Sequence, residues 1–145
     1  MNAGISKPDE EEIRALIKDH FEGMHWTPNT SPDWKRFSVD FLPEASLFSA
    51  ARPVQIRTLE AFIDRMNDVA GSTLHTFEEH TLGMEILGFG NIAVVLAASE
   101  MLENEVETNH DVSGYLLVKD EGEWRIAAHA WDQASEQMPV PEHLR

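Results

Sequence analysis

The sequence predicts an α+β fold in which N-terminal helices pack on a strongly curved, mainly antiparallel sheet and form a cone with an internal pocket. Apolar residues recur at the helical period before residue 70 and at the strand period after residue 72. Turn residues also divide the second half of the chain into four runs. Because 42% of the 145 residues are hydrophobic, we expect a single domain over residues 1–145, with residues 1–8 and 136–145 as flexible tails.

The first helix is expected to begin at Pro8, where the acidic run 9–12 complements the positive end of the helix dipole. His20 falls within the apolar stripe of this helix and not on its charged face. We therefore expect its side chain to point inward. The other residues of the stripe have the 3.6-residue helical spacing: Ile13, Leu16, Ile17, Phe21 and Met24.

Two shorter helices and a short strand are expected next. Ser-Pro-Asp at residues 31–33 is an N-cap signal with proline at the first helical position, and Pro43 ends the helix that follows. Residues 45–49 have the pattern of a short strand. A third helix is predicted over residues 58–69, which place their large apolar side chains on one face.

Four strands are expected after residue 72, over residues 73–87, 92–102, 112–119 and 124–131. The last two form a hairpin. Residues 92–102 are apolar on both faces, which is typical of a central strand that is covered on both sides. Something must therefore cover the outer face of the sheet.

Three segments carry a resemblance to a known family: FLPEA at residues 41–45, FGNIA at residues 89–93 and LLVKDEGEWRI at residues 116–126. With this order of elements, the chain from about residue 9 to residue 134 resembles the nuclear-transport-factor-2-like (NTF2-like) superfamily, which includes ketosteroid isomerases, SnoaL-type polyketide cyclases and scytalone dehydratase. The resemblance implies a cystatin-like cone. It also implies a homodimer through the outer sheet face, which would cover the central strand.

The same resemblance argues against one reaction of the family. The carboxylate base of ketosteroid isomerases aligns near Ser49 or Ala50, and neither residue can abstract a proton. Their two oxyanion-binding groups align near His20 and near Ser113 or Gly114, so the protonated acid of that site is missing here. Steroid isomerisation by that mechanism is not expected.

Four titratable residues are candidates for acid or base chemistry: His20, His80, Glu100 and Asp132. His20 aligns with an oxyanion donor, or is a core histidine bonded to a backbone carbonyl or to Glu100. Glu100 lies on the even face of the central strand and is either catalytic or part of an ion pair. Asp132 lies roughly where SnoaL-type cyclases carry an acid or base, or is an exposed strand end.

Strand alternation decides which of these side chains face the pocket. On residues 73–87 the even-numbered side chains are the more apolar set and are expected to face inward. This places Glu78 and His80 in the pocket and leaves His75 and Glu79 in solvent.

Five residues are candidates for ligand contacts: Trp26, Trp34, Phe48, Glu78 and Ser113. For the three aromatic residues, plain core packing is the alternative. On residues 124–131, alternation puts His129 and Trp131 on the outer face, although a bulge would reverse this assignment.

The composition excludes several classes of partner. The chain has 26 acidic and 11 basic residues and a formal net charge of -15, so it should repel nucleic acids and anionic membranes. It has no cysteine, and the two histidines of HTFEEH at residues 75–80 point to opposite faces of a strand, so no metal site is expected. The sequence shows neither a signal-peptide pattern nor a membrane-spanning run, and a cytoplasmic protein is expected.

These observations predict a domain that binds a small apolar molecule without a cofactor. One hypothesis is a lyase, isomerase or cyclase that acts on a small cyclic or carbonyl compound by acid and base catalysis. The alternative is a non-catalytic ligand-binding, accessory or dimerisation domain. Whether the chain is an enzyme stays open on the sequence alone.

Overall fold

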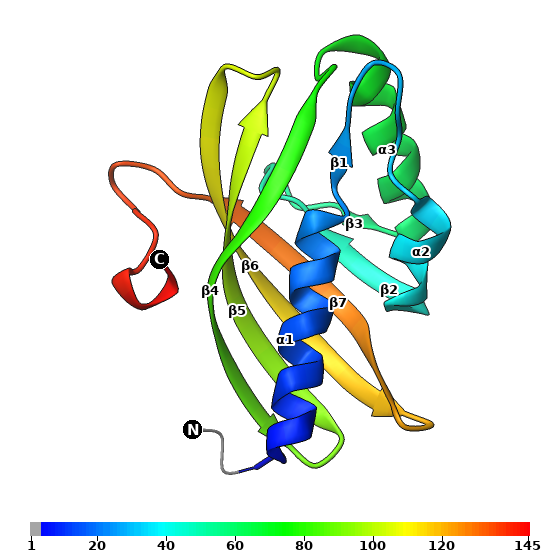
Figure 1. The fold of residues 1–145 in the computed structure, drawn as a ribbon, viewed down its shortest axis with the longest axis vertical. Coiled ribbons are helices and arrows are strands. Elements are labelled where there is room, and N and C mark those ends of the chain that lie inside the picture. Colours follow the sequence, from blue (N-terminus) through cyan, green and yellow to red (C-terminus); the bar gives the residue numbers. More distant parts are fainter. Residues whose placement is uncertain (1–3) are drawn as a thin grey trace.

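The computed structural model describes residues 4–145, which form three α-helices packed on one face of a curled, seven-stranded mixed sheet (Figure 1). The strand order is β1-β4-β5-β6-β7-β2-β3, in which only β2 and β7 pair in parallel. The predicted α+β class and the curved, mainly antiparallel sheet are confirmed. The elements are α1 (Lys7–Glu22), β1 (His25–Trp26), α2 (Trp34–Val39), β2 (Phe41–Phe48), β3 (Ile56–Arg57), α3 (Leu59–Ser72), β4 (Phe77–Phe89), β5 (Ile92–Glu103), β6 (Glu107–Asp120), β7 (Glu123–Gln133) and the 3₁₀ turn η1 (Glu142–Leu144).

Helix α1 lies across the inner face of the sheet (Figure 1). It begins one residue before the predicted start, because the Ser6 hydroxyl caps it by accepting a hydrogen bond from the Asp9 backbone N–H (3.2 Å). Most of the predicted stripe is buried and Leu16 is half-buried; the buried side chains of α1 are Ile13, Ile17, His20 and Phe21. No helix within residues 4–145 is long and apolar enough to cross a membrane.

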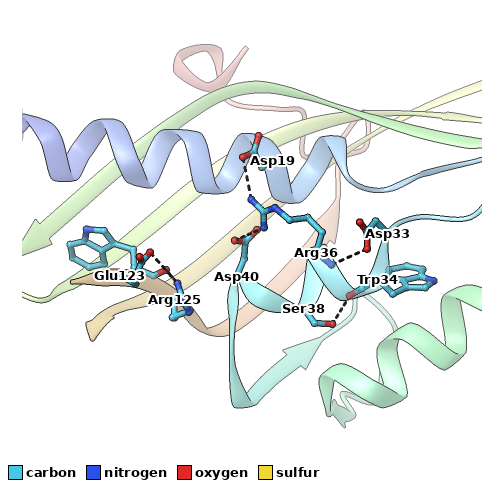
Figure 2. Close-up of polar contacts among 9 residues, drawn as sticks. Asp19, Asp33, Trp34, Arg36, Ser38, Asp40, Glu123 and Arg125 are labelled. Atoms are coloured by element: carbon cyan, nitrogen blue, oxygen red, sulfur yellow. Dashed lines mark hydrogen bonds and ion pairs between the residues drawn. The ribbon is translucent and has the colours of Figure 1, made fainter. Parts of the chain in front are cut away.

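Helix α2 is short, and polar contacts fix it to its neighbours (Figure 2). Asp33 caps it by accepting a hydrogen bond from the Arg36 backbone N–H (3.0 Å). The Arg36 guanidinium pairs with Asp40 at the end of α2 (3.1 Å) and with Asp19 on α1 (3.7 Å). The Asp40 carbonyl accepts a hydrogen bond from the Ile126 backbone N–H (2.8 Å), so this cluster connects α1, α2 and β7.

Two irregularities in the sheet decide which side chains face the helices. On β4, the pairing with β5 shifts between Thr81 and Met84. Odd-numbered side chains such as Phe77 are buried before the shift, and even-numbered ones such as Ile86 after it. On β7, the pairing with β6 skips Ala127. Each bulge moves the following side chains to the opposite face of the sheet.

The C-terminal segment packs on the outside of β4, which departs from the flexible tail expected for residues 136–145 (Figure 1). Leu144 is fully buried and clusters with Val140 and Ala98. The backbone approaches so closely that a Cβ on Gly83 would lie 2.8 Å from the Leu144 Cα. His143 Nε2 also lies 3.2 Å from Glu85 Oε1. The small apolar cluster holds the segment in place, and the glycine at residue 83 leaves room for the close approach of the backbone.

The described part of the N-terminal segment is also ordered. The Gly90 backbone N–H donates a hydrogen bond to the Gly4 carbonyl (2.9 Å), and Ile5 packs against the main core. Residues 4–8 thus contact the sheet and begin α1, in contrast to the flexible tail expected for them. The remainder of that prediction, residues 1–3, lies outside the described residues.

Candidate functional site

A cavity of about 170 Å³ is lined by α1, α3 and the inner face of β4 to β7. Its apolar walls consist of four aromatic residues and three methionines: Phe21, Phe62, Phe77, Trp131, Met24, Met66 and Met101. Five polar side chains line the same space: His20, Glu79, Asp111, Ser113 and His129. An apolar cavity with a few convergent polar groups is the usual form of a small-molecule site.

His20 enters the cavity from α1 and is only 4% exposed. Its ring lies 5.0 Å from the rings of Phe37 and His129. Its Nδ1 has no hydrogen-bond partner among residues 4–145, neither a backbone carbonyl nor Glu100. Because burial penalises the imidazolium, the pKa of His20 falls to about 3 and the ring is neutral at physiological pH.

His129 enters from β7 and stacks on Tyr115, with ring centroids 4.3 Å apart. The expectation that it lies on the outer face is wrong, because the bulge at Ala127 turns it inward. Neither ring nitrogen has a hydrogen-bond partner in the described part of the chain. Burial, with a smaller contribution from His20, holds the pKa of His129 well below its usual range. A neutral imidazole with two free nitrogens can donate one hydrogen bond and accept another.

Glu79 is the carboxyl group of the cavity wall on β4. Its Oε2 accepts a hydrogen bond from the Ser99 hydroxyl (2.7 Å). Burial outweighs this bond and raises the pKa of Glu79 to about 8, so the group is largely protonated at neutral pH. The expectation that Glu79 is solvated is therefore wrong.

Asp111 supplies a second carboxyl group from β6, where it lies opposite Ser99 in the sheet. Glu79, Ser99 and Asp111 thus form a polar row across three neighbouring strands. Burial, followed by the charges of Glu103 and Asp132, raises the pKa of Asp111 to about 7. Two carboxyl groups of raised pKa in one cavity are typical of functional sites, although ion-pair networks can produce the same effect.

Comparison with solved structures identifies the architecture. An NTF2-like protein of unknown function from Pseudomonas putida superposes with a TM-score of 0.73 at 16% identity, over 98% of this chain and 99% of that one. The chain has the NTF2-like fold. No protein-family model matches the sequence, and a search of curated proteins found no match.

Two further similar structures carry the names of enzymes. A putative scytalone dehydratase from Novosphingobium aromaticivorans has a TM-score of 0.68 at 11% identity, covering 88% of this chain and 85% of that one. A hexachlorocyclohexane dehydrochlorinase from Novosphingobium barchaimii has a TM-score of 0.70 at 12% identity, covering 88% of each chain. At these identities the comparison establishes the fold alone.

Two predicted pocket residues of β4 lie outside the NTF2-like cavity. The side chain of His80 is 57% exposed and lies 3.7 Å from Glu78, which is 38% exposed. The inward orientation expected for both is wrong. The even-numbered residues of β4 are apolar mainly after the bulge, and before the bulge the even-numbered side chains face outward. Before the bulge it is Phe77 and Glu79 that face the helices.

Glu100 and Asp132 also lie outside the cavity. Glu100 continues the outer face of β5, and its Oε1 lies 3.3 Å from His110 Nε2. This contact is of the kind expected in the ion-pair interpretation of Glu100. Asp132 is exposed near the end of β7, as in the alternative reading of that residue.

Of the five predicted ligand contacts, only Ser113 lines the cavity, where it is 2% exposed. Trp26 is a core residue that stacks on Phe77 and donates a hydrogen bond from Nε1 to the Leu74 carbonyl (2.8 Å). Trp34 donates from Nε1 to Asn67 Oδ1 (3.1 Å) at the surface. Phe48 lies on the outer face of the sheet, and Glu78 lies beside His80.

The NTF2-like cavity therefore brings together only two of the nine predicted residues, His20 and Ser113. Sequence reasoning missed Glu79, Asp111 and His129. Glu79 on β4 and His129 on β7 are odd-numbered polar residues. Their numbering would have indicated that they face the helices only if the bulges on these two strands had been located. Within residues 4–145 no group of three or more His, Cys, Asp or Glu side chains is arranged to hold a metal ion.

Proposed function

We propose that this NTF2-like domain binds a small single-ring molecule and transfers a proton on it by acid and base catalysis. The observation that carries the proposal is the convergence of Glu79, His20 and His129 on one apolar cavity, with histidine nitrogens that have no protein partner. Buried polar groups without partners are costly, and a ligand that bonded to them would remove this cost.

The chemical roles follow from the protonation states. With a pKa near 8, the ionised Glu79 is a stronger base than an ordinary carboxylate. It would remove a proton from the carbon next to a carbonyl. His20 and His129 are neutral, and an imidazole N–H from either would donate to the oxygen on which negative charge develops. The proton held by Glu79 would then return to another ligand atom, which gives isomerisation, or to a leaving group, which gives elimination.

The cavity volume limits the size of the ligand. A cavity of about 150 Å³ is enough for benzene. The volume of about 170 Å³ therefore suits one ring with a few substituent atoms. This agrees with the absence of the ketosteroid isomerase acids at the aligned positions. The names of two structural neighbours, a dehydratase and a dehydrochlorinase, denote eliminations and lend support to this reaction class.

Deuterium exchange into cyclohexanone tests the proposal, because removal of the proton next to the carbonyl is the common first step. In heavy water the protein should accelerate exchange above the buffer rate, and the rate should rise with pH until Glu79 is ionised, at about 8. We expect Glu79→Gln to lower the catalysed rate by about 100-fold, the usual contribution of a general base. The matched control is Glu78→Gln on the outer face, which should keep the full rate.

A non-catalytic ligand-binding domain is the second candidate. It is favoured if cyclohexanone shifts the NMR signals of His20 and His129 while exchange stays at the buffer rate. If neither the signals nor the exchange rate change with any single-ring ketone, the cavity is not a ligand site of this kind and the proposal is wrong.

We further propose that two copies of the chain associate through the outer face of the sheet. Six large apolar side chains are exposed there, on β4, β5 and β6: Leu87, Phe89, Ile92, Val94, Leu96 and Leu116. We call these residues the outer apolar patch. A contiguous patch of this kind is characteristic of interaction sites. A second copy would cover the central strand β5, as the resemblance to the NTF2-like superfamily implies.

A further inference from the structure

The charges that line the cavity are all of one sign. Glu79 and Asp111 are its two ionisable acids, and no Lys or Arg occurs among the described residues that line it. His20 is neutral over the physiological range, and so is His129. The cavity can therefore carry a formal charge of zero or below, but not above. A ligand with a carboxylate or a phosphate would be repelled there once the two acids are ionised.

Neither acid has a cationic partner among residues 4–145. The side-chain hydrogen bond of Glu79 comes from the uncharged Ser99, and its electrostatic neighbours are Asp111 and Tyr115. The groups that act on Asp111 are the carboxylates Glu103 and Asp132, together with burial. Ionised acids in such a place lack compensation, and a cation supplied from outside would provide it.

The apolar walls are suited to the same kind of ligand. Phe77 and Trp131 line the cavity together with both acids. The faces of aromatic rings carry negative electrostatic potential and attract cations, most strongly where water is excluded. His129, which is only 6% exposed, also lines the cavity with two ring nitrogens that have no partner in the described residues, and one of them can accept a hydrogen bond.

We propose that the cavity binds an organic cation of single-ring size, such as a protonated cyclic amine or a ring with a quaternary nitrogen, held by Glu79 and Asp111 between the aromatic walls. This inference rests on the proposed ligand pocket and specifies the charge of its ligand. It replaces the purely apolar molecule expected from the sequence with an apolar ring whose positively charged nitrogen is recognised by the two acids.

The proposal has a defined pH dependence. In the free protein Asp111 ionises near pH 7 and Glu79 near pH 8. A cation binds to the ionised acids, so its affinity should rise with pH across this interval and binding should release protons. The charged or titratable groups around the two acids are Glu103, Asp132, Tyr115, His20 and His129, and none of them becomes cationic in the interval.

N-methylpyridinium and toluene form a matched pair of probes. They have the same shape and the same number of non-hydrogen atoms, but N-methylpyridinium has a permanent positive charge that does not change with pH. We expect N-methylpyridinium to bind at least about tenfold more tightly than toluene at about pH 9 and to lose most of this advantage at about pH 6. Binding would be measured by NMR titration of the His20 and His129 signals, with calorimetry for proton release.

Three variants locate the effect. Asp111→Asn combined with Glu79→Gln should reduce the affinity for N-methylpyridinium to that for toluene and remove its pH dependence. Glu78→Gln removes a carboxylate of the same strand outside the cavity and should leave both affinities unchanged. Toluene binding by the double variant shows that the cavity is still folded, so a loss of cation binding is not mistaken for unfolding.

Two results would overturn the proposal in different ways. If toluene binds as tightly as N-methylpyridinium at about pH 9, the cavity is a ligand site without preference for a cation, and the proposed function survives. If neither probe shifts the signals of His20 and His129, the cation site and the proposed ligand pocket both fail.

Discussion

At the scale of single residues, the buried proton of Glu79 links the cavity to the stability of the fold. Its pKa rises from an ordinary value of 4.5 to about 8 in the folded chain. Between these two values the folded protein keeps a proton that the unfolded chain loses. The free energy of unfolding should therefore fall as pH rises through this window. Asp111 acts in the same direction up to about pH 7, and His20 acts in the opposite direction below its ordinary value of 6.5.

We predict that Glu79→Gln flattens this dependence. A difference of one bound proton changes the free energy of unfolding by about 1.4 kcal/mol per pH unit. Between the unfolded and folded pKa values of Glu79, the downward slope of the variant should therefore be smaller by up to about that amount. Urea denaturation at a series of pH values measures the slope. Glu78→Gln is the control, because its carboxylate is on the outer face. Parallel curves for wild type and Glu79→Gln would show that the proton on Glu79 is not held.

At the scale of elements, the C-terminal segment has the composition of a loose tail, but it is packed on β4 through Leu144. We predict that Leu144→Ala lowers the free energy of unfolding by about 2 kcal/mol, the lower range for truncation of a buried leucine, since this cluster lies at the edge of the molecule. Met138→Ala, at a side chain that is 72% exposed in the same segment, should change it very little. Chemical denaturation compares the two. Equal stabilities would mean that the segment does not dock in solution.

At the scale of the whole molecule, the outer apolar patch should determine the oligomeric state. We predict that the wild-type chain sediments as a dimer and that Val94→Glu, which places a charge in the middle of the patch, sediments as a monomer. Val94 is 49% exposed, so the glutamate can be solvated in the monomer without unfolding it. Val39→Glu, at a similarly exposed valine on α2, is the control and should remain a dimer. A monomeric wild type would refute the proposed association.

The local pattern of the sequence was enough to predict the order and type of the main elements. The stripe of α1 predicted that His20 points inward, because a helix of constant period leaves no ambiguity about its faces. The two-residue strands β1 and β3 were not predicted, because a strand that short has no period of its own and exists only through its partners on β4 and β2. The docking of Leu144 on Gly83 was missed for a related reason, since it joins distant parts of the chain.

What the sequence by itself determined about this protein is its class: helices before strands, a strong negative charge, and one histidine on the inner face of the first helix. The tertiary structure decided the site. The bulges on β4 and β7 exchange the faces of these two strands, so that Glu79 and His129 line the cavity while His80 lies outside it. A one-residue shift in pairing reverses every side chain that follows, and the position of such a shift depends on the neighbouring strand and not on the strand's own sequence.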